Sequence, residues 1–310
     1  MRVTVPSFAK LNLDLRVLSK RVDGYHELRT IFQTISLKDS LGIEFATAKR
    51  TEIELDSPIE IADNLVVRAA KLVLEHLKVK ARVRFTLDKQ IPMGAGLGGG
   101  SSNAAATLIA LPALAGRRVP HHTLAALAEA LGSDVPFFLH GGTALGLGRG
   151  TEIYPLPDLR QHHVLVVSTG IHVSTAQAYG RLGRCVTDAL TSARESPILR
   201  EFQAIAWALK NTSLEQLPLK NDFEPAVFET HPELAAVVRK LRRLGAKPAM
   251  LTGSGSAVFG AFESDAGARR AAGAFRAAHT YSIRFVNRRQ YRTLWRRALG
   301  PAAEASCFGG

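Results

Sequence analysis

A glycine-rich segment between Ile91 and Asn103 holds the residues of this chain that could most directly bind a phosphate. It reads Ile-Pro-Met-Gly-Ala-Gly-Leu-Gly-Gly-Gly-Ser-Ser-Asn, and an alanine-rich, helix-forming run follows at once. Glycines allow the backbone to approach a bulky polar ligand, and Ser101 and Ser102 are expected to cap the following helix. Backbone N–H groups at the start of a helix bind phosphate readily, so the segment predicts a nucleotide site.

Three common glycine motifs fit this segment poorly. Gly94, Gly96 and Gly99 match the dinucleotide fingerprint, but the acidic residue expected about 20 positions later is absent from residues 116–122. The P-loop motif needs a lysine directly after its last glycine, and the segment has none. A protein-kinase loop needs His-Arg-Asp and Asp-Phe-Gly elsewhere, and neither occurs. A flexible linker is disfavoured because a strand-like run and a strong helix former flank the segment.

A carboxylate and an amine elsewhere in the chain could serve proton transfer. Asp134 lies where a helical pattern stops against Pro136, and turn statistics alone favour a capping or turn role for it. Lys10 and Asn12 alternate with leucines, so on a strand they share one face and could reach one ligand. A cation beside a carboxylate keeps the carboxylate ionised and stabilises a developing alkoxide.

The elements that must position these residues form a mixed α and β pattern. Residues 10–17 alternate between apolar and polar side chains, which is typical of a strand. A strand-like run at 81–87 enters the glycine-rich segment and a helix from about Ser102 leaves it. Further expected elements are helices at 64–77, 123–131 and 232–244, short strands at 250–252 and 257–262 around a Gly-Ser-Gly-Ser turn, a domain boundary at 156–157 and a frayed tail from Pro301.

Composition limits the class of protein. A length of 310 residues with 46% hydrophobic residues allows two domains with their own cores. The net charge of +13 invites a nucleic-acid interpretation, but the basic residues are dispersed and lack interleaved aromatic residues, so solvated helix faces are the expectation. A basic nucleic-acid-binding protein remains the alternative from a different class.

Targeting and cysteine content predict a cytoplasmic protein. No apolar run approaches the ~20 residues that a bilayer requires, and the first residues lack a signal-peptide pattern, so no membrane partner is expected. Cys185 and Cys307 lie far apart in sequence and suggest neither a disulfide framework nor a cysteine metal site.

The glycine-rich segment resembles the phosphate loop of the galactokinase, homoserine kinase, mevalonate kinase and phosphomevalonate kinase (GHMP) superfamily. Its triple glycine before Ser-Ser is similar to one branch in particular, whose substrate carries a cytidine diphosphate group. Other segments of that branch follow in the same order, namely residues 8–13 (Phe-Ala-Lys-Leu-Asn-Leu), 23–28 (Asp-Gly-Tyr-His-Glu-Leu), 63–70, 132–138 (Gly-Ser-Asp-Val-Pro-Phe-Phe), 173–179 and 251–259. The resemblance covers roughly residues 5–290.

This resemblance implies a two-domain α/β (α+β) fold. The expected domains are an N-terminal ATP-binding domain like ribosomal protein S5 domain 2 at 1–155 and a ferredoxin-like substrate domain at 156–285. A C-terminal segment at 286–310 is expected to dock on the first domain, with Tyr291, Leu294 and Trp295 as its apolar face and a frayed end.

The implied activity is ATP-dependent phosphorylation of the 2-hydroxyl of 4-diphosphocytidyl-2-C-methyl-D-erythritol, in the non-mevalonate route to isoprenoid precursors. Asp134 is expected to be the general base, with Lys10 as its partner. ATP and Mg²⁺ are the implied cofactors, and the small-molecule substrate is the implied partner, with no nucleic acid and a monomer or weak dimer. No metal ligand is assigned, because Ser101 or Ser102 could supply a hydroxyl to Mg²⁺ but no obvious carboxylate ligand appears in the sequence.

The resemblance also implies the binding residues. Expected at ATP are Pro92, Met93, Gly94, Ala95, Gly96, Leu97, Gly98, Gly99, Gly100, Ser101 and Ser102, with Asn64 near the adenine and Lys89 upstream. Expected at the substrate are Asn12, Tyr25, His26, Thr175, Tyr179 and Gly253, with Tyr25 and Tyr179 on opposite sides of the cytosine and His26 hydrogen-bonded to it.

Two features bear on the limits of the resemblance. Residues 221–224 read Asn-Asp-Phe-Glu where the family more usually has leucine third, which predicts a packing change without effect on the chemistry. A sister kinase acting on homoserine or mevalonate is the nearest alternative, and Tyr25, His26 and Tyr179 disfavour it because they suit a cytosine.

Overall fold

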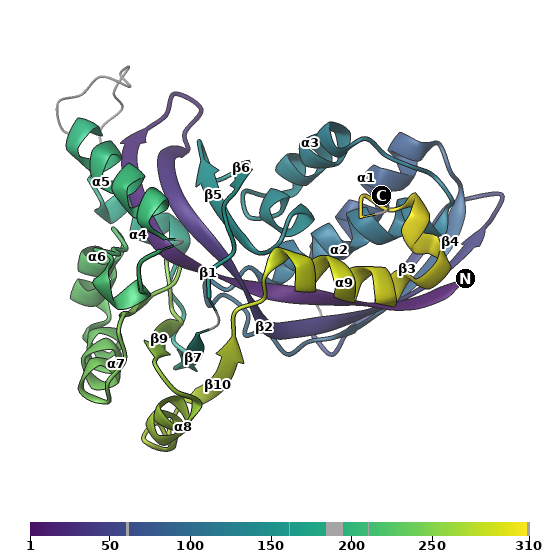
Figure 1. The fold of residues 1–310 in the computed structure, drawn as a ribbon. Helices are drawn as coiled ribbons and strands as arrows, with labels where there is room; N and C mark the ends of the chain where they lie inside the picture. Colours follow the sequence, from purple (N-terminus) through teal and green to yellow (C-terminus); the bar gives the residue numbers. More distant parts are fainter. Residues whose placement is uncertain (60–61, 161, 184–194, 210, 309–310) are drawn as a thin grey trace.

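The fold, described by a computed structural model, is built on two β-sheets within residues 1–59, 62–160, 162–183, 195–209 and 211–308 (Figure 1). The first half contains β1 (Arg2–Lys20), β2 (His26–Thr47), β3 (Glu52–Asp56), α1 (Leu65–Leu77), β4 (Ala81–Asp88), α2 (Gly99–Leu114), α3 (His121–Leu131), η1 (Pro136–Leu139), β5 (Thr143–Leu147) and β6 (Glu152–Pro155). The second half contains β7 (His163–Ser168), α4 (Thr175–Arg181), α5 (Glu195–Ala208), η2 (Leu214–Gln216), α6 (Glu224–Thr230), α7 (Pro232–Arg243), β8 (Ala249–Leu251), β9 (Val258–Phe262), α8 (Asp265–Gly273), β10 (His279–Arg284), α9 (Arg288–Leu299) and η3 (Gly300–Ala305).

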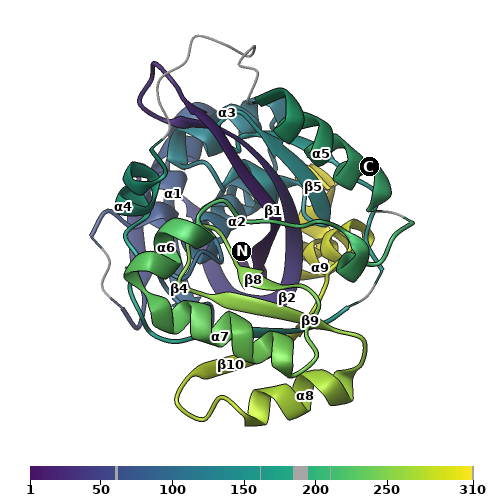
Figure 2. The same cartoon turned by 90° about the vertical axis from the view of Figure 1, so that its left-hand side faces the viewer.

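The first sheet has the order β3-β4-β2-β5-β6, with β1 paired to β2, and the second has the order β10-β7-β9-β8. All pairings in the second sheet are antiparallel. Apart from α4, α5, η2 and α6, which are inserted after β7, the chain order is β7-α7-β8-β9-α8-β10, and with this strand order it is the ferredoxin-like arrangement. Helices α7 and α8 lie together on the outer side of this sheet (Figure 2). The expected two-domain α/β fold is therefore confirmed, while the exact domain boundaries stay predictions.

Strands β1 and β2 are long enough to connect the two halves of the molecule (Figure 1). The predicted strand at 10–17 is part of β1, but its polar face is covered as well as its apolar face. Lys10, Asn12, Asp14 and Arg16 are 0–4% exposed. The pairing of β1 with β2 shifts register between Asn12 and Asp14, which is typical of a β-bulge and bends the strand locally. These polar groups therefore face partners inside the protein rather than water.

Helix α2 begins three residues earlier than the sequence suggested. Its N-cap is Gly98, and Ser101 and Ser102 lie within its first turn, so the prediction that the serines cap the helix was wrong. The chain turns into the helix at Gly98 with φ +71°, a left-handed conformation that glycine adopts without strain. A Cβ at Gly98 would lie 2.9 Å from the ring of Phe138, so the close packing there also requires glycine.

Helix α2 contains a proline near its end, and helix α3 begins earlier than predicted. Helix α2 continues past Pro112 to Leu114, buried in the core of the first domain, because side-chain burial outweighs the hydrogen bond that proline cannot donate. Helix α3 begins at His121 instead of residue 123.

The C-terminal segment packs on the first domain. Helix α9 opens with a capping box at Asn287 and lies along β1, and it buries Tyr291, Trp295 and Leu299 (Figure 1). Leu294, predicted to be part of this apolar face, is instead 36% exposed. The predicted fraying from residue 301 was also wrong for residues 301–308, because η3 follows and Phe308 is 4% exposed against Tyr291 and Trp295.

Candidate active site

Two cavities meet at the glycine-rich loop, which is defined here as residues 92–98. The larger one, the central cavity, has a volume of about 940 Å³ and lies between β1, this loop and the segments 172–180 and 253–255. The smaller one, the loop cavity, has a volume of about 320 Å³ and lies between the loop and the start of α1. Gly94, Gly96 and Ser101 line both cavities, so a ligand in one is separated from a ligand in the other by little more than backbone.

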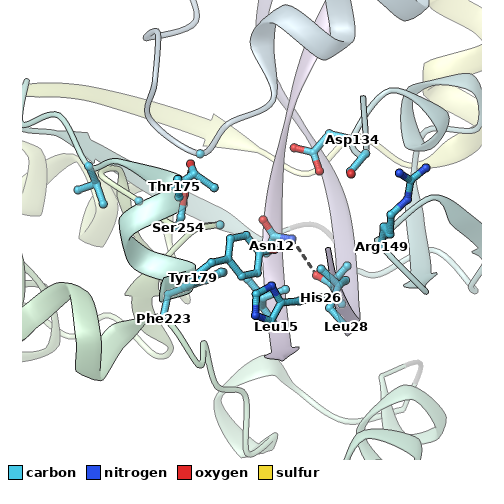
Figure 3. Close-up of a pocket in the computed structure, with 18 of the residues that line it drawn as sticks. Asn12, Leu15, His26, Leu28, Asp134, Arg149, Thr175, Tyr179, Phe223 and Ser254 are labelled. Carbon is cyan, nitrogen blue, oxygen red and sulfur yellow. Dashed lines mark hydrogen bonds between the residues drawn. The ribbon is translucent and has the colours of Figure 1, made fainter. Parts of the chain in front are cut away.

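Lys10 and Asp134 come together in the central cavity, although they are far apart in sequence. The distance from Lys10 Nζ to Asp134 Oδ2 is 3.3 Å. The lysine side chain is 3% exposed and the carboxylate is 32% exposed, so the amine is enclosed while the carboxylate remains open to the cavity. Figure 3 shows Asp134 directed into the cavity from the side opposite Thr175. A carboxylate that is open to a ligand and backed by a buried amine can accept a proton from an alcohol.

The position of Lys10 is set by the neighbouring strand and the glycine-rich loop. Lys10 Nζ donates a hydrogen bond of 2.6 Å to Asn12 Oδ1, and Asn12 Nδ2 donates one of 2.8 Å to Thr30 Oγ1. The backbone N–H of Lys10 donates to the carbonyl of Leu97 at 3.0 Å. Because β1 and the loop are joined directly in this way, a ligand on the loop lies next to the amine.

A turn from the second domain closes over the loop. The side chain of Thr252 accepts a 3.0 Å hydrogen bond from the backbone N–H of Asn12, and Ala257 N donates to the carbonyl of Ala95. A Cβ added at Gly96, where φ is +76°, would lie 2.2 Å from the carbonyl oxygen of Thr252. Gly253 approaches the same backbone, since a Cβ there would be 3.3 Å from the carbonyl oxygen of Gly96. The two domains therefore touch backbone to backbone at this point.

Aromatic side chains form the far wall of the central cavity (Figure 3). The rings of His26 and Tyr179 stack at 4.6 Å, and Phe223 meets Tyr179 edge-on at 4.8 Å. Burial, and secondarily the charge of Asp134, raise the pKa of Tyr179 to about 12, so its hydroxyl stays protonated at neutral pH. Tyr25 is 51% exposed at the cavity rim.

Tyr25 and Tyr179, which were predicted to lie on opposite sides of a cytosine, each contact a different side chain of the protein. The ring of Tyr179 lies against His26, while one face of Tyr25 is covered by the guanidinium of Arg149 at 4.5 Å. Thr175 lies at the start of α4, and its hydroxyl is 2.8 Å from that of Ser254. All of these side chains line the one cavity.

The segment 221–224 holds the second-domain turn in place. Asn221 Nδ2 donates to the carbonyls of Leu251 and Gly253 at 2.9 and 2.8 Å, and Glu224 accepts from the N–H of Leu251. Burial raises the pKa of Glu224, and the Leu251 N–H opposes that shift. Phe223 packs edge-on against Tyr179 and also lines the central cavity, and the absence of an effect on the chemistry stays a prediction.

The predicted ATP residues surround the loop cavity, with one exception. Pro92, Met93, Gly94, Ala95, Gly96, Leu97, Gly98, Gly99, Gly100 and Ser101 line it, together with Asn64 and Lys89. Ser102 is 2% exposed and lines neither this cavity nor the central one. Asn64 caps α1 by accepting from Val66 N, and Lys89 Nζ donates to Asp39 at 2.6 Å. The amine of Lys89 is thus engaged within the protein.

Other residues of the central cavity were not predicted from the sequence. Arg149, Lys20 and His172 line it with Leu15 and Leu28. Arg149 lies in the turn between β5 and β6 and pairs with Glu129 of α3 at 2.8 Å, so its place at the rim depends on these elements. The only sign of Arg149 in the sequence is that it lies between two glycines. That pattern does not indicate which cavity the side chain faces.

Metal binding can be tested against the donors present. In the part of the chain that the structure describes, no group of three or more His, Cys, Asp or Glu residues could hold a metal ion. The hydroxyl of Ser101 belongs to a residue that lines both cavities. Mg²⁺ usually keeps several waters and binds through substrate phosphates with one or two protein ligands, and this sparse donor set fits that behaviour. Within the same residues, no helix has the length and apolar character to span a membrane.

Comparisons with known proteins place the chain in a superfamily. The GHMP kinases N terminal domain matches residues 64–142, and the GHMP kinases C terminal domain matches residues 198–280. A solved homoserine kinase from Cytophaga hutchinsonii has a TM-score of 0.68 at 18% identity, covering 93% of this chain and 96% of its own, which shows a shared fold. The chain is thus a member of the GHMP kinases.

More similar proteins narrow this class. A 4-diphosphocytidyl-2-C-methyl-D-erythritol kinase of Solibacter usitatus is 52% identical over 293 residues, with 94% of this chain and 92% of the relative covered. One of Thermodesulfovibrio yellowstonii is 37% identical, with 87% and 93% covered. A crystal structure of 4-(cytidine 5'-diphospho)-2C-methyl-D-erythritol kinase has a TM-score of 0.74 at 38% identity, covering 92% of this chain and 99% of its own. Within the GHMP kinases, the chain belongs to the 4-diphosphocytidyl-2-C-methyl-D-erythritol kinase family.

Proposed function

We propose that this protein transfers the γ-phosphate of ATP to the 2-hydroxyl of 4-diphosphocytidyl-2-C-methyl-D-erythritol, giving the 2-phosphate and ADP. The observation that carries the proposal is the approach of Lys10 Nζ to Asp134 Oδ2 within 3.3 Å in the central cavity, next to the glycine-rich loop. The relatives' names support the choice of substrate. The proposed place of action is the cytoplasm, where ATP is available.

In the proposed reaction, Asp134 accepts the proton of the hydroxyl as its oxygen bonds to the γ-phosphorus. The bond between this phosphorus and the bridging oxygen of ATP breaks, and ADP leaves. Lys10 lies beside the carboxylate and is buried, so its charge stabilises the negative charge that develops on the attacking oxygen. Phosphoryl transfer depends mainly on positioning and charge neutralisation, which such an arrangement supplies.

ATP is proposed to lie in the loop cavity with its phosphates against the glycine-rich loop. The N-terminal end of α2 carries unpaired N–H groups and a partial positive charge, which favour an anion there. Magnesium would be held by the phosphates, water and the Ser101 hydroxyl. When bound, it would neutralise part of the charge on the triphosphate.

The substrate is proposed to place its cytosine at the aromatic wall and its methylerythritol end near Asp134. Tyr25, His26 and Tyr179 offer ring faces and edge hydrogen bonds suited to a pyrimidine. Thr175 and Gly253 lie along the same cavity toward the loop. The alcohol would then lie between the base and the γ-phosphate.

Phosphorus NMR with ATP, Mg²⁺ and the cytidylyl substrate tests the proposal directly. We expect a new phosphomonoester signal and the appearance of ADP. The control is 2-C-methyl-D-erythritol 4-phosphate, which lacks the cytidylyl group. Equal phosphorylation of both alcohols would remove the proposed cytosine pocket, and no ATP turnover with either would remove the proposed activity.

A further inference from the structure

A buried carboxylate outside both proposed binding sites connects the two ends of the glycine-rich loop. Asp39 lies on β2, is 0% exposed, and accepts hydrogen bonds from four donors in the described part of the chain. Its Oδ1 accepts from the backbone N–H groups of Gln90 and Ile91, each at 2.8 Å. Its Oδ2 accepts from Lys89 Nζ at 2.6 Å and from Asn103 Nδ2 at 3.0 Å.

These donors lie on opposite sides of the loop in sequence. Residues 89–91 connect β4 to the loop, whereas Asn103 lies in α2, after the loop has turned into the helix. Both groups are therefore fixed to one point on β2, and β2 also pairs with β1, which carries Lys10. The loop between them has glycines with left-handed φ at 94, 96 and 98 and few side chains that could fix its shape. Its ends must supply that constraint.

The packing around Lys89 supports this arrangement. The side chain of Lys89 is 7% exposed, and its amine also donates to the carbonyl of Ile91 at 3.2 Å. A Cβ at Gly99 would lie 2.8 Å from Lys89 Nζ and 3.0 Å from Ile91 Cγ2. Gly99 has no left-handed φ, so it is the approach of the lysine, and not backbone conformation, that favours glycine there. The first residue of α2 thus leaves room for the ion pair.

We infer that Asp39 is a positioning residue for nucleotide binding, acting through Lys89 and Asn103 to hold the loop in the shape that receives the phosphates. The inference rests on the proposed function, because it assumes that the loop binds ATP. It also assigns Lys89 a different role from direct contact with ATP. Asp39 does not reach either cavity, so its effect on ligands is entirely through the loop.

The test is the dissociation constant of MgADP, measured by titration calorimetry on the full chain without any turnover. Asp39→Asn keeps the shape and one acceptor oxygen, but it removes the charge and its amide N–H groups must face one of the two pairs of donors. We expect MgADP to bind about 10-fold more weakly, because hydrogen bonds to a charged group are stronger than neutral ones and part of that stabilisation holds the loop. Lys89→Met should weaken binding by about 5-fold, and the double variant should be no weaker than Asp39→Asn alone, as expected for one shared interaction.

Asp14→Asn is the matched control. Asp14 is also 0% exposed and pairs with Arg16 at 2.8 Å, but it bonds to Lys220 N and not to residues 89–103. It should lower the free energy of unfolding while leaving the affinity for MgADP within about 2-fold.

The outcomes separate the inference from the proposed function. Unchanged MgADP affinity in Lys89→Met and Asp39→Asn, with the wild type binding normally, overturns the role of Asp39 alone. A wild type that does not bind MgADP overturns the proposed function and the inference together. Where Asp39→Asn does not fold, Lys89→Met and Asn103→Ala decide the same question, since each removes one end of the connection. Equal weakening in the Asp14→Asn control would also reject a specific role.

Discussion

Replacing Gly96 by alanine should separate the glycine-rich loop from the second domain. A Cβ at this position would lie 2.2 Å from the carbonyl oxygen of Thr252 and 3.0 Å from that of Gly255. Both neighbours are backbone atoms, so neither can rotate away as a flexible side chain would. The loop or the turn must shift by about 1 Å to restore ordinary contact, and the shift acts where the two proposed ligands meet.

Two other glycines separate the cost of backbone strain from the cost of the steric clash. At Gly94 φ is +63°, but the nearest atom to a Cβ is His172 Nδ1 at 3.5 Å, so alanine there meets backbone strain without a clash. Gly100 lies in α2 with only Leu65 Cδ1 at 3.7 Å, so alanine there meets neither. Left-handed strain costs about 1–2 kcal/mol, and overpacking of a rigid site adds about 1–3 kcal/mol.

The expected order of stability follows from these terms. Gly100→Ala should raise the free energy of unfolding by about 0.5 kcal/mol because it reduces chain entropy in a helix. Gly94→Ala should lower it by about 1 kcal/mol, and Gly96→Ala by about 3 kcal/mol. Urea unfolding measures all three, and steady-state kinetics should show the largest loss of turnover in Gly96→Ala. If Gly96→Ala and Gly94→Ala were equally stable, the backbone contact between the domains would not exist as described.

Further predictions concern the proton acceptor, the aromatic wall and the response to acid. Asp134→Asn should lower kcat by about 10²–10⁴-fold while MgADP affinity stays within about 2-fold, and near wild-type turnover would exclude Asp134 as the base. Tyr25→Ala should mainly raise KM for the cytidylyl substrate, since it removes ground-state binding, and a pure kcat effect would contradict its place at the rim. Burial, assisted by His121 and nearby arginines, lowers the pKa of His140 from 6.5 to about 4. As pH falls below about 6.5 the unfolded chain binds this proton first, so the free energy of unfolding should decrease down to about pH 4, by at most ~1.4 kcal/mol per pH unit. His140→Gln should flatten this slope in urea unfolding at several pH values, and an unchanged slope would assign the acid response to other groups.

Local sequence was a good guide to elements whose pattern depends on neighbours in the chain. The period of two at 10–17, the helix predicted at 64–77 and the two short strands before and after residues 252–257 all occur within a residue of their predicted positions. The start of α2 was predicted too late because serine is a common N-cap and two serines follow the glycines. The helix instead begins after Gly98, which adopts a left-handed conformation and has no side chain to clash with Phe138. Capping preferences are local, whereas the contact with Phe138 is not.

The order of motifs along the chain also indicated which residues would lie in one site, but it did not predict the contacts between them. Lys10 and Asp134 were expected to converge, and their side chains are 3.3 Å apart. The places of Arg149 and Phe223 in the central cavity could not be predicted from the sequence. Arg149 reaches Tyr25, which lies more than 100 residues away in sequence, from a turn whose direction depends on the sheet. Phe223 reaches the cavity only because its segment packs against Tyr179. Residues 301–308 pack for a similar reason, since Phe308 finds its apolar partners only on the folded first domain.

The sequence alone therefore determined the family, the two-domain α/β fold and the set of residues around the loop, because motif order and periodicity are properties of the chain itself. Only the tertiary structure decided that Lys89 is directed to Asp39, that Gly96 must lack a side chain, and that His26 stacks on Tyr179. Each of these depends on the distance between atoms from different segments. Such distances are set by how β1, β2 and the second sheet pack together, and no local pattern encodes them.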